Sequence, residues 1–316
     1  MNYLNLLKTC VLCPNKCKIN RFTGRTGSCG ASADIEISTA LPHYGEEPPI
    51  SGSRGSGTIF FGHCNMKCVY CQNFQISQEF KKKTFRILTI PELADTMVKF
   101  QKLGCHNVNY VSPTIWIPHI IEALKIARNE KSLTIPAVFN SGGYENPGII
   151  KMLKGLIEIY MPDMRYNNDS SAYRYSGVKN YTKNNKKSLI EMYSQVGGLK
   201  TDKNGIAQRG LIIRLLIMPN DIGEVRKSLD FIKNELSTDV YISIMAQYHP
   251  LYKAHSFSGL NRRINYNEYI EIINYAEKLG FSEGAFQDYE DAETVEDLFI
   301  PDFNKEDVFG YKKENH

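Results

Sequence analysis

The chain has 316 residues, of which 42% are hydrophobic and 23% charged, as in folded globular proteins. Its 38 basic and 34 acidic residues leave a net charge of +4, too even a balance to indicate binding to nucleic acid or membranes through bulk charge. Because no apolar run approaches the ~20 residues of a membrane span and no signal-peptide pattern precedes the early cysteines, we expect a cytoplasmic protein whose eight cysteines are thiols or metal ligands.

Residues 1–50 hold a dense set of cysteines among glycines and prolines. Cys10 and Cys13 form a C-x2-C pair, and Cys17 and Cys29 follow. Tight turns let several sulfur atoms converge on one centre, and both a zinc ion and an auxiliary iron–sulfur cluster take four thiolates. The spacing does not decide between the two, and disulfides are the alternative that a reducing cytoplasm disfavours. We expect a metal-binding extension followed by a linker.

Proline and glycine are frequent from Asp34 to Gly57, and both oppose helices and central strands. The composition therefore predicts a connecting segment. His43 and Glu46 could approach a nearby site from it, but we expect a solvated loop there, because connections mostly run over the surface.

A buried strand is predicted at Thr58–Gly62, and it leads into Cys64, Cys68 and Cys71 with the spacing C-x3-C-x2-C. Three thiolates leave one iron of a [4Fe-4S] cluster open to an outside ligand. That iron can be chelated by the amino and carboxylate groups of S-adenosylmethionine (SAM), whose reductive cleavage gives a 5'-deoxyadenosyl radical. A zinc knuckle, or three unrelated buried thiols, is the alternative.

Beyond these cysteines, short apolar runs alternate with amphipathic stretches. This order predicts a parallel sheet built from βα units, closed or partly closed as a barrel. The predicted strands are Thr58–Gly62, Asn107–Val111, Ile135–Phe139, Leu156–Met161, Leu211–Met218 and Val240–Ala246. The predicted helices are Ile90–Leu103, Trp116–Arg128, Pro147–Lys154, Ser170–Gln195, Gly223–Leu236 and Tyr266–Leu279.

Polar residues follow each predicted strand, where a parallel barrel carries its chemistry. SAM needs donors for its carboxylate and ribose and compensation for its sulfonium charge, which hydroxyl, amide and carboxylate groups supply. Proline, glycine, asparagine and aspartate also end strands for structural reasons alone. The candidates after the second, third, fourth and sixth strands are Ser112, Pro113, Thr114, Asn140, Ser141, Asp163, Arg165 and His249.

Several runs of the chain resemble the pyruvate formate-lyase activating-enzyme-like family of the radical SAM superfamily. The resemblance extends over nearly the whole chain and implies a partial (β/α)6 TIM-like barrel, a [4Fe-4S] cluster on the three clustered cysteines, and SAM as cofactor. The matching runs are Cys10–Pro14, Pro48–Phe61, Cys71–Ser77, Ile159–Tyr166, Gly205–Leu211 and Ile244–Pro250.

The resemblance also implies roles for single residues. Asn140 and Ser141 are similar to an Asp-Thr pair of glycyl-radical activating enzymes, with Asn in place of Asp. Asp163 and Arg165, the candidate catalytic residues, resemble their Asp-x-Lys pair, and Arg keeps the positive charge of Lys. His249 matches a histidine near the nucleotide.

The family implies a radical SAM enzyme that abstracts hydrogen from a substrate, which in activating enzymes is a glycine of a partner protein. Modification of another protein, peptide or small molecule is the alternative, and a non-catalytic iron–sulfur protein is a further one. We expect an electron donor such as flavodoxin or ferredoxin, a protein substrate, and no nucleic acid or membrane partner. The barrel is expected at residues 51–282, between the extension at 1–50 and an acidic tail at 283–316.

Overall fold

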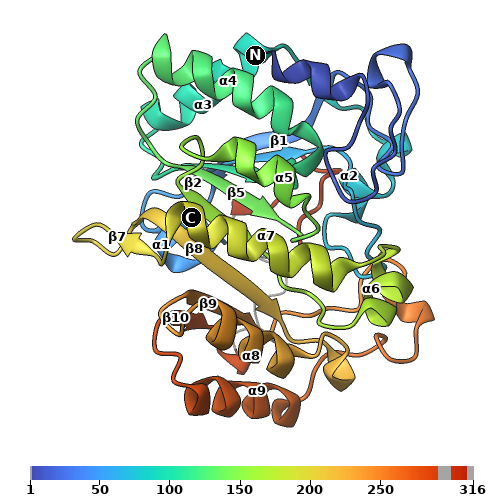
Figure 1. Cartoon of the computed structure of the whole chain (residues 1–316), viewed down its shortest axis with the longest axis vertical. Coiled ribbons are helices and arrows are strands. Elements are labelled where there is room, and N and C mark those ends of the chain that lie inside the picture. Colours follow the sequence, from blue (N-terminus) through green and yellow to red (C-terminus); the bar gives the residue numbers. More distant parts are fainter. Residues whose placement is uncertain (1, 291–299, 312–316) are drawn as a thin grey trace. The chain divides into compact units, whose positions relative to one another are not determined.

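The computed structural model describes residues 2–290 and 300–311 (Figure 1). The chain packs into two compact units, and each is built from several segments. Unit 1 comprises Met1–Met66, Thr84–Pro162 and Lys183–Ile212. Unit 2 comprises Lys67–Lys83, Asp163–Thr182 and Ile213–His316.

Unit 1 contains a mostly parallel sheet with hydrogen-bonded strand order β3-β1-β2-β4-β5-β6-β8. Strands β2, β4, β5, β6 and β8 run parallel, whereas β1 is antiparallel to β2 and β3, and the short β7 to β8. Every residue of β2, β4, β5 and β6 is buried, as expected for parallel strands covered on both faces. The strands are β1 (Ile35–His43), β2 (Ser56–Phe61), β3 (Arg86–Leu88), β4 (Val108–Val111), β5 (Ala137–Ser141), β6 (Ile159–Pro162), β7 (Lys200–Thr201) and β8 (Ala207–Leu216).

The helices of unit 1 follow local sequence signals. Helix α3 begins with a capping box, in which the Thr89 hydroxyl and the Glu92 carboxylate satisfy each other's free backbone N–H groups. Helices α3 and α4 lie side by side (Figure 1). The helices are α1 (Pro48–Ser51), α3 (Ile90–Lys102), α4 (Ile117–Asn129), α5 (Pro147–Ile150) and α7 (Tyr181–Val196), with 3-10 turns η1 (Tyr3–Leu7), η2 (Arg21–Thr23), η4 (Pro113–Trp116) and η5 (Lys151–Leu153).

Unit 2 includes the last residues of strand β8, from Ile213 onward. In the strand order, β9 follows β8 and β10 follows β9. Strands β9 and β10 pair in parallel, and the N–H of Ile217 donates to the carbonyl of Met245 beside them. Helices α8 and α9 pack against each other (Figure 1). The elements are α2 (Phe74–Ser77), α6 (Asp169–Ser176), α8 (Val225–Glu235), β9 (Tyr241–Met245), α9 (Tyr266–Leu279), β10 (Gly284–Phe286), η3 (Phe80–Lys82), η6 (Pro219–Asp221) and η7 (Ala254–Ser256).

The predicted α/β class with a mostly parallel sheet is confirmed, and all six predicted strands are present as β2, β4, β5, β6, β8 and β9. The connecting segment predicted from Asp34 to Gly57 is wrong, because β1 and α1 lie in it. Strand β1 accommodates Pro42, which has no backbone N–H. Strand β3 pairs only with Ile35–Ile37 of β1, so no residue of β3 lies opposite Pro42 to accept that hydrogen bond.

The single helix predicted at Ser170–Gln195 is in fact two helices, α6 and α7. Gly177 separates them with φ of +65°, a left-handed conformation that ends a helix readily at glycine. Part of the predicted acidic tail, residues 291–299 and 312–316, lies outside the described residues, and the domain boundaries at 50 and 282 stay predictions. Among the described helices, none is both long and apolar enough to cross a membrane.

Candidate metal and cofactor site

The three clustered cysteines straddle the division of the chain, which falls between Met66 and Lys67. Cys64 therefore belongs to unit 1, and Cys68 and Cys71 belong to unit 2. In unit 1 the sulfur of Cys64 accepts a hydrogen bond from the backbone N–H of Met66 at 3.5 Å. The neighbouring Asn65 anchors this turn by donating to the carbonyl of Tyr144 at 2.6 Å.

In unit 2 the sulfur of Cys68 lies at the end of a chain of hydroxyl groups. The Ser176 hydroxyl, on the last residue of α6, donates to this sulfur at 3.0 Å. Ser176 is also 2.8 Å from the hydroxyl of Tyr166, which lies 2.5 Å from the hydroxyl of Tyr70. All three hydroxyl groups are buried, so the chain shields Cys68 from water while supplying it with a donor.

Cys71 is also contacted by a hydroxyl group, at 3.3 Å from Ser77 Oγ. Burial, followed by the proximity of Cys68, raises the pKa of the Cys71 thiol to about 11. Each sulfur of the C-x3-C-x2-C motif thus has a hydrogen-bond contact, from Met66, Ser176 or Ser77. Hydrogen bonds to cysteine sulfur stabilise metal-bound thiolates and tune cluster potentials. Each of the three sulfurs, taken within its own unit, therefore has surroundings that suit a metal-bound thiolate.

Asp163 and Arg165, predicted as a functional pair, form an ion pair in unit 2, with 2.5 Å between Oδ2 and Nη2. Asp163 also accepts from Nε of Arg214 at 2.8 Å, and Arg165 Nη1 lies 4.0 Å from the sulfur of Cys68. Burial lowers the pKa of Arg165, but Asp163 and then Cys68 outweigh this and raise it well above its ordinary value. Arg165 therefore stays protonated beside Cys68, with its charge balanced by the carboxylate of Asp163.

Arg214 is a functional candidate that the sequence analysis missed. Its only sequence signal is a single charge within the apolar run Leu211–Met218. The Arg214 side chain is only 16% exposed, and its parallel bridge with Asp163 brings the two residues together.

The predicted residues at the ends of β4 and β5 lie together in unit 1. The N–H of Ser112 donates to the carbonyl of Asn140 at 3.0 Å, and Ser112 adopts a left-handed conformation with φ of +58°. The Asn140 amide donates to the carboxylate of Glu46 at 3.2 Å, and the Asn109 amide donates to the same carboxylate at 2.8 Å. The expectation that Glu46 belongs to a solvated loop is wrong, since Glu46 places a carboxylate at these strands.

His43, the other residue of that segment, is also not solvated, because it closes strand β1 and is 6% exposed. Its ring packs edge-on against Phe60. Burial lowers the pKa of His43 to about 4, although Glu47 opposes this. The imidazole is therefore neutral at physiological pH.

Thr114 and Ser141 both contact a buried carboxyl group, that of Glu145. The Thr114 hydroxyl donates to Oε1 of Glu145 at 2.8 Å, and Oε2 is buried without a hydrogen-bond partner in the described structure. Glu145 is fully buried, and this burial raises its pKa to about 7. Pro113, between Ser112 and Thr114, is buried and begins η4.

We expect Glu145→Gln to be more stable than the wild type at about pH 8 and close to it near pH 5. A carboxyl group whose pKa rises on folding contributes stability below its unfolded value of 4.5, and this contribution is lost as pH rises through about 7. The shift corresponds to about 3 kcal/mol. Urea unfolding across this pH range measures the difference, and the exposed Glu130→Gln is the control. A difference that does not change with pH would contradict the prediction.

The N-terminal cysteines lie in unit 1, and their loop is folded on itself. The backbone carbonyl of Cys10 accepts a hydrogen bond from the N–H of Lys18 at 2.8 Å, and the N–H of Cys10 donates to the carbonyl of Ile19 at 2.9 Å. These two bonds join the two ends of the loop. All eight cysteines are free thiols, and no disulfide links any of them. Within residues 2–290 and 300–311, no three His, Cys, Asp or Glu side chains are arranged to hold a single metal ion.

No family model matches the chain. Uncharacterized protein MJ0674 of Methanocaldococcus jannaschii is 35% identical to it over 282 residues, which cover 87% of this chain and 76% of that protein. The chain belongs to the same family as MJ0674.

One solved structure, that of HydG, shares the fold of this chain. HydG, a maturase of the [FeFe]-hydrogenase, matches with a TM-score of 0.52 at 11% identity, covering 76% of this chain and 53% of HydG. The chain therefore spans about half the length of HydG. Methylornithine synthase (PylB) matches with a TM-score of 0.48 at 13% identity, covering 80% of this chain and 74% of that one. The likeness to HydG supports the fold class.

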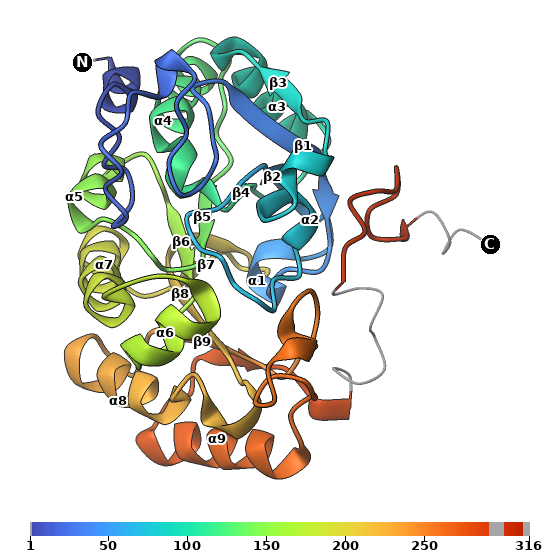
Figure 2. The same ribbon diagram turned by 90° about the vertical axis from the view of Figure 1, so that its right-hand side faces the viewer.

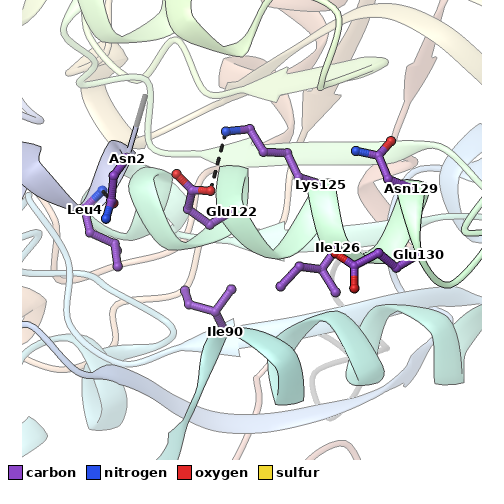
Figure 3. Close-up of a pocket in the computed structure, with 8 residues that line it drawn as sticks. All are labelled: Asn2, Leu4, Ile90, Glu122, Lys125, Ile126, Asn129 and Glu130. Carbon is purple, nitrogen blue, oxygen red and sulfur yellow. Dashed lines mark hydrogen bonds and ion pairs between the residues drawn. The ribbon is translucent and has the colours of Figure 1, made fainter.

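Two further features are a predicted site residue, His249, and a surface pocket. His249 is buried just after β9 in unit 2. The pocket lies on unit 1, between the N-terminus and helices α3 and α4, and Figure 3 shows Lys125 and Glu122 paired along α4. None of the predicted site residues lines it, so it plays no part in the predicted chemistry. The lining residues are Asn2, Leu4, Ile90, Glu122, Lys125, Ile126, Asn129 and Glu130.

Proposed function

We propose that the chain is a radical SAM enzyme whose [4Fe-4S] cluster is held by Cys64, Cys68 and Cys71. The observation that carries this proposal is the C-x3-C-x2-C spacing, with each of its three sulfurs in hydrogen-bond contact with a neighbouring group. The fold shared with HydG, a maturase of the [FeFe]-hydrogenase, is compatible with it. When bound, the cluster supplies the electron that cleaves SAM reductively.

Residues of the chain would bind and orient SAM. The Asp163–Arg165 pair lies beside Cys68, so it offers a cation for the SAM carboxylate and an anion for its sulfonium or amino group. The carboxylate of Glu46, shared by Asn109 and Asn140, offers a second anionic group from unit 1. Ser112 and His249 remain candidates for further contacts with the cofactor.

The hydrogen-abstraction step needs a substrate and an external one-electron donor such as flavodoxin or ferredoxin. We propose a protein substrate, with the glycine of a glycyl-radical enzyme as the first candidate, because the resembling family acts on one. EPR of the enzyme with SAM, reductant and a candidate partner would show a glycyl radical signal if this holds. If 5'-deoxyadenosine forms while no partner glycine loses hydrogen, another protein, peptide or small molecule is the substrate.

We expect the reduced, anaerobically reconstituted protein to show an EPR signal from one [4Fe-4S] cluster at Cys64, Cys68 and Cys71, and this signal should change when SAM is added. The change follows from SAM entering the coordination sphere of the open iron. The Cys10/Cys13/Cys17/Cys29→Ser variant is the best protein for this measurement. It lacks the four N-terminal thiols, so they cannot bind iron and add to the signal. A cluster signal that is indifferent to SAM would argue strongly against the proposed function.

A further inference from the structure

The N-terminal loop of unit 1 surrounds a buried arginine, Arg21, which is only 1% exposed. Its Nε donates to the carbonyl of Ser32 at 2.7 Å, and its Nη1 to the carbonyl of Ile115 at 2.7 Å. The guanidinium also lies over the ring of Trp116, 4.9 Å from its centroid. In the described structure, Nη2 has no hydrogen-bond partner, and the Arg21 side chain contacts that of Cys10. Burying a cation without a negative partner costs free energy, so an anion beside Arg21 would stabilise it.

The groups that act most strongly on Arg21 are thiols. In their ionised form, Cys29 and Cys10 would act on Arg21 more strongly than the carboxylate of Glu36 does. Glu36 itself is engaged by His63, 3.0 Å from its Nε2. The anion that Arg21 lacks can therefore come from the cysteines, provided that they are thiolates.

The sulfur atoms of this loop are already contacted by donors. The Cys13 sulfur is hydrogen-bonded by the N–H of Asn15, and the Cys29 sulfur by the N–H of Ala31. The N–H of Ser28 donates to the Cys17 sulfur at 3.5 Å. Backbone N–H groups aimed at sulfur are a feature of metal–thiolate loops, because they stabilise negative charge on the sulfur.

The loop also passes close to the Cys17 sulfur at Gly27, where there is no room for a side chain. A Cβ atom added at Gly27 would lie 2.8 Å from that sulfur, so any other residue there would displace it. The loop contacts the segment that carries Cys64, since the ring of His63 lies 3.2 Å from the carbonyl of Cys29 and the amide of Asn15 donates to Asn65 at 2.9 Å. In Figure 2 the N-terminal segment, in blue, runs beside α4 and α5. The N–H of Tyr3 donates to Glu122 of α4, and the amide of Asn146, at the start of α5, donates to the carbonyl of Val11.

We propose that Cys10, Cys13, Cys17 and Cys29 hold an anionic tetrathiolate metal centre and that Arg21 is its buried counter-cation. Four thiolates around one zinc ion, or around an oxidised [4Fe-4S] cluster, leave a net negative charge that one guanidinium offsets in part. Within the described residues no three of these side chains are arranged around a single metal ion, so a zinc ion would require the sulfur atoms to lie closer together. The inference does not depend on SAM cleavage.

The first test is metal analysis of the Cys64/Cys68/Cys71→Ala protein, purified anaerobically. One zinc or about four irons per chain is expected, and the count distinguishes the two metals. In the same protein the four thiols should resist alkylation until a chelator removes the metal. No metal, together with freely alkylated thiols in the folded protein, would overturn the inference without affecting the proposed function.

The second test is a double-mutant cycle between Arg21 and the four cysteines. In the Cys64/Cys68/Cys71→Ala background, Arg21→Met should speed metal loss to a chelator by about 10–100-fold. Arg21→Lys, which keeps the charge, should show a smaller effect, and the exposed Arg25→Met should show none.

The cycle also isolates the electrostatic coupling from the lost carbonyl contacts of Arg21. When Cys10, Cys13, Cys17 and Cys29 are serines, Arg21→Met should lower the melting temperature clearly less than it does in the metal-bound protein. An equal loss in both backgrounds would make Arg21 a purely structural residue. If Arg21→Met does not fold, the comparison of Arg21→Lys with Arg25→Lys in the chelator assay decides the same point.

Discussion

Changing Cys64, Cys68 and Cys71 to alanine should reduce 5'-deoxyadenosine formation to background while leaving the fold intact. The reason is that the cluster and its open iron are lost together, so SAM loses the iron at which it would be bound and reduced. The fold should persist because the core of unit 1 consists of apolar strand residues such as Ile59 and Phe139, both fully buried. Chromatographic detection of 5'-deoxyadenosine after anaerobic incubation with SAM and dithionite measures the effect.

Cys105→Ala is the matched control, since Cys105, like Cys68, is buried (2% exposed) but lies outside both cysteine groups. It should keep SAM cleavage at the wild-type level. Residual cleavage by the triple variant at a substantial fraction of the wild-type rate would mean that the cluster lies elsewhere, and the four N-terminal cysteines would then be the next candidates.

The elements of the fold were predictable where the signal was local. The Thr89–Glu92 and Asn265–Glu268 capping boxes mark the starts of α3 and α9 within a few residues of sequence. Continuous apolar runs likewise mark parallel strands. Strand β1 was missed because Pro42 and the surroundings rich in proline and glycine resemble a linker, while the pairing of β1 with β2 is a tertiary feature.

The site was predictable only in its motifs. The cysteines share a spacing, but Glu46 contacts Asn140 across 94 positions of the chain, and Tyr70 contacts Tyr166 across 96. Such contacts depend on strand register and loop path, which no local pattern encodes. Arg21 was missed for a different reason. A single arginine in a loop is normally solvated, and only its burial distinguishes it from its neighbour Arg25.

Asp163→Ala should be the most destabilising single substitution among the predicted site residues, by about 3 kcal/mol. Asp163 is 4% exposed and accepts hydrogen bonds from two guanidinium groups, those of Arg165 and Arg214. Removing it leaves two like charges close together with no acceptor between them. We take the lower end of the usual range, because the arginine side chains are 24% and 16% exposed and water screens them in part. Urea unfolding measures the loss.

Stability and cofactor binding can be separated with Arg165→Ala, which removes the charge beside Cys68 but leaves the Asp163–Arg214 pair in place. This variant should lose less stability than Asp163→Ala while binding SAM at least about tenfold more weakly, because a charge-assisted contact is lost. Equilibrium binding of SAM to the reconstituted protein measures the second effect. Glu271→Ala, which breaks the exposed pair with Arg226, should change neither quantity by much. If Asp163→Ala and Arg165→Ala both bind and cleave SAM as the wild type does, the pair is structural and its predicted role in the cofactor site is wrong.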